Sequence, residues 1–148
     1  MSNNKQFTAE TQLNLSPFFK RTSKLNESQE WKRWSGYLSA THYELTHDNE
    51  YFAIRTKAAL LDITPLKKYI IEGPDAQKYL NHLVTRNINI CKVGQVMYTP
   101  WCDEDGKVID DGTVQRLSND KFRITSAEPN FNWIEHNAEG MNLTIKDD

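Results

Sequence analysis

The clearest periodic pattern in the chain lies between Gly73 and Val84. Apolar residues recur there at the spacing i, i+3, i+4, i+7 and i+8, which is typical of a helix with one buried face. They are Ala76, Tyr79, Leu80, Leu83 and Val84. The preceding Gly73-Pro74-Asp75 supplies residue types that favour a helix start. The pattern therefore predicts a helix that packs one stripe against a sheet.

Short runs rich in apolar and β-branched residues, separated by Gly, Asp, Asn and Ser, predict the strands of that sheet. A shorter helix is expected between Pro129 and Gly140. The predicted strands cover residues 67–73, 95–102, 107–117, 121–126 and 141–147. The order from Lys67 onward is β-α-β-β-β-α-β. This order predicts an α+β fold with a mainly antiparallel sheet and helices on one face, ferredoxin-like with one added strand.

The N-terminal part of the chain has weaker patterns. Residues 1–15 are polar with isolated apolar positions, and we expect a disordered tail there. Residues 16–35 look irregular and carry five basic and two acidic side chains interleaved with aromatic ones. That segment is either a ligand-facing surface or the cover of a core edge. A helix is expected from about His47 to Leu60. The sequence therefore predicts a tail over residues 1–15 and one domain over residues 16–148.

Composition and charge exclude several classes of protein. The 148 residues carry 18 basic and 20 acidic side chains, a net charge of −2, which gives no support to nucleic-acid or membrane binding. No apolar run approaches the roughly 20 residues of a membrane span, and Met1–Glu10 lacks the apolar core of a secretory signal. We expect a soluble, cytoplasmic protein. Cys91 and Cys102 lack the spacing of a zinc site, and no disulfide framework is expected.

Acidic residues cluster between Asp103 and Asp111, at and after the predicted hairpin turn. A calcium loop of the EF-hand type needs carboxylates where this chain has Trp101 and Gly112, so that interpretation fails. The acids of the turn are typical of a solvated hairpin tip. No metal site is predicted.

Asp110 and Asp111 differ from the turn acids because they lie inside a predicted strand, where Asp is disfavoured. Successive side chains of a strand point to opposite faces, so Asp111 shares a face with Thr113 and Gln115 while Asp110 faces the other way. A single carboxylate beside a partly covered cavity is suited to orienting a protonated amine. A cross-strand ion pair or a simply exposed strand Asp is the structural alternative. Tyr98, on the neighbouring strand, is either a wall of the same cavity or a core residue.

Five segments, taken together and in order, resemble the aminomethyltransferase family, whose founding member is the T-protein of the glycine cleavage system. The combination of GPDA with the later DG-x-VIDD hairpin is the most specific part, and the resemblance covers about residues 16–147. The segments are SPFFKRT (16–22), AIRTKAALLDIT (53–64), IIEGPDAQKYLNHLVTRNI (70–88), GQVMYTPWCDEDGKVIDDGTV (94–114) and FNWI (131–134).

The resemblance implies one-carbon transfer from a methylated or aminomethyl amine donor to tetrahydrofolate, with the donor group carried on a lipoyl arm in the T-protein. It places the catalytic carboxylate of the family on Asp111 and its pterin-contacting tyrosine on Tyr98. Thr113, Gln115 and Thr125 are then expected to contact the folate. A fixed carboxylate suits such a transfer because iminium and ammonium species are cationic.

Some positions depart from the family pattern. Thr64-Pro65-Leu66 replaces a usual Ser-His-Met, Gln115 a usual Tyr, and Thr125 a usual Asn. These departures favour a T-protein-like relative with another methylated amine as donor. Two functional hypotheses stay open: a one-carbon transferase domain, and a non-catalytic folate-binding or interaction module of the same fold.

The family runs to more than twice this length, so the chain resembles the first half of the folate-binding domain. We therefore expect it to be incomplete by itself. A homodimer or a second half-domain chain is expected to complete it. The sheet edge that such a partner would use is expected along residues 121–126 or 141–147, because an unpaired strand edge recruits another strand.

Overall fold

A computed structural model describes residues 12–148, so most of the tail predicted over residues 1–15 lies outside the described residues. Contacts within the chain form two compact units that divide after Pro65. Each unit is described by itself. The division predicted from the sequence, a tail and one domain over residues 16–148, stays a prediction.

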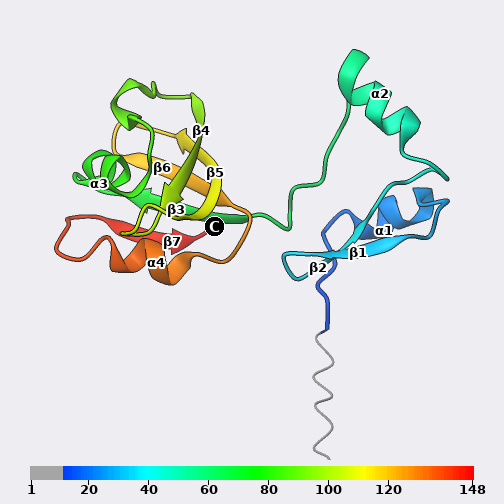
Figure 1. Ribbon diagram of the computed structural model, residues 1–148, viewed down its shortest axis with the longest axis horizontal. Coiled ribbons are helices and arrows are strands. Elements are labelled where there is room, and N and C mark those ends of the chain that lie inside the picture. Colours follow the sequence, from blue (N-terminus) through cyan, green and yellow to red (C-terminus); the bar gives the residue numbers. More distant parts are fainter. Residues whose placement is uncertain (1–11) are drawn as a thin grey trace, which may run out of the picture. The chain divides into compact units, whose positions relative to one another are not determined.

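The unit from Leu66 to Asp148 is an antiparallel sheet with two helices (Figure 1). Its strands stand in the order β4-β5-β6-β3-β7, and every neighbouring pair is antiparallel. The elements are β3 (Lys67–Glu72), α3 (Ala76–Leu83), the short 3-10 helix η2 (Ile88–Ile90), β4 (Val96–Cys102), β5 (Val108–Arg116), β6 (Lys121–Ser126), α4 (Phe131–His136) and β7 (Thr144–Asp147). The predicted β-α-β-β-β-α-β order and the α+β class are confirmed, and β4 is the added strand.

The core lies between one face of this sheet and the two helices. The stripe predicted on α3 is buried there together with Ile134 of α4. The sheet contributes Tyr69 and Ile71 of β3, Trp101 of β4, Val114 of β5, and Phe122 and Ile124 of β6. The Tyr79 hydroxyl donates to the Ile134 carbonyl oxygen at 2.5 Å and so links α3 to α4. Burial raises the pKa of Tyr79.

The position of β6 corrects the expectation about the exposed edge. β6 pairs with β5 on one side and with β3 on the other, so residues 121–126 are a central strand. β7 pairs only with β3 among the described strands and forms an edge. The close approach of β5 and β6 depends on Gly112, since a Cβ atom there would lie 1.8 Å from the Thr125 carbonyl oxygen.

The unit before Leu66 corrects the prediction of an irregular segment over residues 16–35. It contains α1 (Phe19–Thr22), the 3-10 helix η1 (Ser23–Leu25), and a hairpin of β1 (Trp31–Trp34) and β2 (Tyr37–Ala40). The two-residue turn Ser35-Gly36 has φ of 44° and 84°, as the mirror-image hairpin turns require. Asn14, placed in the tail by the sequence, bridges to Tyr37.

The helix predicted over 47–60 is shorter than expected: α2 spans Asp48–Thr56. Its residues are all at least partly exposed, so no core packing extends it. Among residues 12–148, no helix has the length and apolar character to cross a bilayer.

Candidate functional site

The face of the sheet opposite α3 and α4 carries all the site residues predicted from the sequence. We call this surface the open face and define it by Tyr98, Pro100, Asp111, Thr113, Gln115, Arg123 and Thr125. Strand pairing fixes their arrangement: Tyr98 stands opposite Thr113, and Thr113 stands opposite Thr125. Asp111 and Gln115 flank Thr113 on the same face of β5. The structure therefore brings together the five residues that the sequence and the resemblance selected.

Asp111 and Tyr98 form the most distinctive contact on the open face. The Asp111 carboxylate raises the pKa of Tyr98, because it attracts the phenol proton and repels the phenolate. The Tyr98 ring is 57% exposed, so a flat ligand has access to it. The pair offers a fixed negative charge next to an accessible aromatic surface.

The hydrogen bonds along the outer edge of β4 explain why the side chains of β4 and β5 lie close together on the open face. The Tyr98 carbonyl accepts from Arg86 Nη1 at 3.4 Å, and the Pro100 carbonyl accepts from the Thr85 N–H at 3.1 Å. Both carbonyls therefore point away from β5. In an antiparallel pair, the side chains of two residues that stand opposite each other at non-hydrogen-bonded positions lie closer together than those at hydrogen-bonded positions.

Asp110 lies on the buried face, as the strand alternation predicts. Its Oδ1 accepts the Asp111 N–H at 2.8 Å, and its Oδ2 accepts the Glu128 N–H at 3.1 Å and Asn130 Nδ2 at 2.6 Å. The side chain thus ties β5 to the segment that leads into α4. It shares no face with Asp111, and the two carboxylates form no dyad.

Arg123 also belongs to the open face, and the sequence analysis did not select it. It stands opposite Gln115, and its Nη1 donates to Gln115 Oε1 at 3.4 Å. Its Nε and Nη2 both donate to Asp148 Oδ2 at 2.8 Å. The alternation of side chains along β6 could have revealed it, because that alternation puts Arg123 on the same face as Thr125.

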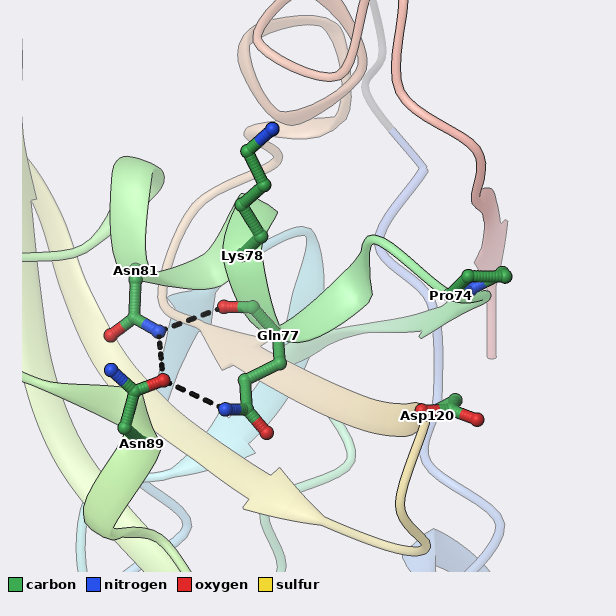
Figure 2. Close-up of a pocket in the computed structure, with 6 residues that line it drawn as sticks. All are labelled: Pro74, Gln77, Lys78, Asn81, Asn89 and Asp120. Carbon is green, nitrogen blue, oxygen red and sulfur yellow. Dashed lines mark hydrogen bonds between the residues drawn. The ribbon is translucent and has the colours of Figure 1, made fainter.

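A hollow of about 540 Å³ lies elsewhere in the unit, beside α3 (Figure 2). None of the predicted site residues lines it. The amide groups there bind one another: Asn89 Oδ1 accepts from Gln77 Nε2 at 2.7 Å and from Asn81 Nδ2 at 2.8 Å. The network stabilises the turn after α3, since Asn81 Oδ1 also accepts the Ile88 N–H at 2.7 Å.

Comparison with known families places the chain among its relatives. The family model described as the GCVT N-terminal domain matches residues 18–148. The chain belongs to this family. The resemblance to the aminomethyltransferases is thereby confirmed, whereas the roles of individual residues on the open face stay predictions.

Relatives with known names include two kinds of enzyme. The chain is 40% identical over 97 residues to a trimethylamine-oxide aldolase of Ruegeria pomeroyi, a match that covers 65% of this chain and 12% of the relative. It is 38% identical over 93 residues to an aminomethyltransferase of Halothermothrix orenii, a match that covers 60% of this chain and 26% of the relative. An aminomethyltransferase of Clostridium botulinum is 33% identical over 119 residues, a match that covers 77% of this chain and 32% of the relative. The matches span only about an eighth to a third of these relatives.

The fold is shared with a solved member of the glycine cleavage system. The crystal structure of aminomethyltransferase T from Bartonella henselae superposes with a TM-score of 0.81 at 24% identity, over 92% of this chain and 38% of that one. The likeness supports the fold described above, including its correspondence to the first part of the T-protein.

Proposed function

We propose that the protein takes part in the transfer of a one-carbon unit from a methylated or aminomethyl amine to tetrahydrofolate. The observation that carries this proposal is that strand pairing places the Asp111 carboxylate and the exposed Tyr98 on the same open face. Membership of the GCVT N-terminal domain family and aminomethyltransferase relatives support it. The donor is either a free methylated amine or an aminomethyl group on a lipoyl carrier.

The open face fits a folate in the kinds of group that it presents. The exposed ring of Tyr98 offers a stacking surface for a heteroaromatic ring. Thr113, Thr125 and Gln115 provide hydroxyl and amide groups that donate and accept hydrogen bonds. Tetrahydrofolate supplies the nitrogen nucleophile that takes up the one-carbon unit.

Asp111 has the central chemical role in this proposal. As the bond between the one-carbon unit and the donor nitrogen breaks, positive charge develops on the transferred group, and the carboxylate stabilises that charge. The donor nitrogen leaves as an amine after it takes up a proton. Tyr98, on the paired strand, presents its exposed ring to the ligand beside Asp111.

A non-catalytic folate-binding or interaction module of the same fold is the second candidate. It is favoured by the exposure of the face, on which Tyr98 is 57% exposed, and by the position of the hollow beside α3, away from Asp111. A ligand on an open face buries one side only, so we expect reduced folate to bind weakly, with a dissociation constant no lower than micromolar.

The two candidates are separated by a turnover assay. The protein is incubated with tetrahydrofolate and a panel of methylated amines, and one-carbon folates are detected by mass spectrometry. We expect product with at least one donor, and a rate lowered roughly 10²-fold by Asp111→Asn. Asp103→Asn, at the hairpin tip, is the matched control and should leave the rate unchanged.

The other outcomes are informative as well. Folate binding without product from any donor would favour the non-catalytic module. Absence of folate binding by titration calorimetry would overturn both the transferase and the folate-binding module and would leave only the interaction module. Equal rates for the native protein and Asp111→Asn would remove Asp111 from the chemistry.

A further inference from the structure

Arg123 places a positive charge on the same face of the sheet as the Asp111 carboxylate. Asp111 and Gln115 are four positions apart on β5, which corresponds to about 13 Å along a strand. Arg123 stands directly opposite Gln115 on β6. The open face therefore has a negative end and a positive end, separated by more than the length of a small amine.

The surface between these two ends is polar, and it is bordered by Lys68, which stands opposite Thr125 on β3 and donates through Nζ to the Leu66 carbonyl at 2.7 Å. Thr113 and Thr125 face each other there and carry short side chains. Both are half-buried, and no ion pair crosses between the two ends in the described residues. An elongated ligand can therefore lie along the face from Asp111 to Arg123 and contact both.

The guanidinium of Arg123 is suited to a carboxylate. Its planar donors match the two oxygens of a carboxylate in a fork geometry. In the structure, Nε and Nη2 both bind one oxygen of Asp148, Oδ2, and the two side chains are 36% and 35% exposed. Exposed ion pairs of this kind are weak, so a ligand carboxylate can replace Asp148 on Arg123.

We propose that Arg123 binds the glutamate carboxylate of the folate while Asp111 faces the reacting nitrogens. This inference rests on the proposed function and assigns the orientation of the folate on the open face. In folates the glutamate is joined to the pterin through a p-aminobenzoyl group, so the charged tail lies far from the reacting nitrogens. In a small methylated amino acid the carboxylate is only a few bonds from the nitrogen, too close to reach Arg123 from Asp111.

The test measures how strongly two variants, each lacking one cationic side chain of β6, bind two different ligands. Arg123→Gln removes the proposed anchor. Lys121→Gln is the matched control, since Lys121 is 39% exposed and pairs with Glu72 at 3.0 Å much as Arg123 pairs with Asp148. Binding of 5-formyltetrahydrofolate and of 6-methyltetrahydropterin, which lacks the p-aminobenzoylglutamate tail, is measured by titration calorimetry on the full chain.

We expect Arg123→Gln to weaken binding of 5-formyltetrahydrofolate by about tenfold or more and to leave the pterin affinity unchanged within twofold. Lys121→Gln should leave both affinities unchanged. Asp148→Asn should tighten folate binding severalfold, because the competing carboxylate is gone. Circular dichroism of each variant verifies that it is folded.

Three results would overturn the inference. They are an equal loss of affinity for both ligands in Arg123→Gln, no loss of affinity for either ligand in Arg123→Gln, and a loss in Lys121→Gln as large as that in Arg123→Gln. A higher KM for carboxylate-bearing donors with unchanged folate affinity would assign Arg123 to the donor instead. If the native chain binds neither ligand, the proposed function itself fails, and this outcome is distinct from the others.

Discussion

Replacing Asp110 or Asp111 by Asn should change two different properties of the protein, because their side chains point to opposite faces of β5. Asp110 is 8% exposed and accepts three hydrogen bonds, whereas Asp111 is exposed and contacts Tyr98. We therefore expect Asp110→Asn to lower stability and Asp111→Asn to lower turnover.

The magnitude for Asp110→Asn follows from its contacts. An Asn side chain must turn its NH₂ group toward one set of donors, and the better orientation keeps Glu128 and Asn130 and loses the bond to the Asp111 N–H. The two remaining bonds also lose their charge-assisted strength. A loss of about 2 kcal/mol in the free energy of unfolding results. It corresponds to a fall of roughly 1 M in the urea midpoint.

Asp111→Asn should leave the free energy of unfolding within about 0.5 kcal/mol, as for other exposed positions. It removes the charge that raises the pKa of Tyr98, so the phenol should titrate at lower pH, closer to its ordinary value. The difference between the absorbance titrations of this variant and of a Tyr98→Phe protein isolates that one phenol.

Urea unfolding followed by circular dichroism measures the stability of both variants under the same conditions. Equal losses of stability from Asp110→Asn and Asp111→Asn would refute the assignment of the two faces. An unchanged pKa of Tyr98 in Asp111→Asn would refute the contact between the phenol and the carboxylate.

Three further predictions concern the core. Gly112→Ala should destabilise the protein by about 3 kcal/mol, because the new Cβ meets the Thr125 carbonyl, and an unchanged melting temperature would contradict that. Tyr79→Phe should cost about 1 kcal/mol in urea unfolding, since the Ile134 carbonyl loses its donor, and a neutral effect would mean that this bond adds nothing. Burial raises the folded-state pKa of Tyr79 above the unfolded value of about 10, so the stability that this shift contributes is complete below that pH and is lost as the pH rises above it. Urea midpoints between pH 8 and 11 should therefore fall more steeply for the native protein than for Tyr79→Phe, and parallel curves would argue against the shift.

The sequence by itself determined the elements of the second unit and the faces of its strands. The apolar spacing on α3 and the alternation on β5 are local patterns, because a helix and a strand each repeat at a fixed interval. They separated Asp110 from Asp111 before any pairing was known. The combination of motifs also identified the family.

Only the tertiary structure decided which strands that are distant in the sequence are neighbours. β3 pairs with β6 and β7, which lie some 50 to 75 residues later, and no local pattern encodes those partners. For that reason residues 121–126 were expected as one of two possible edges, with residues 141–147 as the other, and Arg123 was not connected with Asp111. The hairpin of β1 and β2 was missed although Ser35-Gly36 marks its turn, since charged residues between its two tryptophans hide the alternation. Distant pairing decides which exposed side chains share a surface, and the composition of the open face therefore depends on the fold.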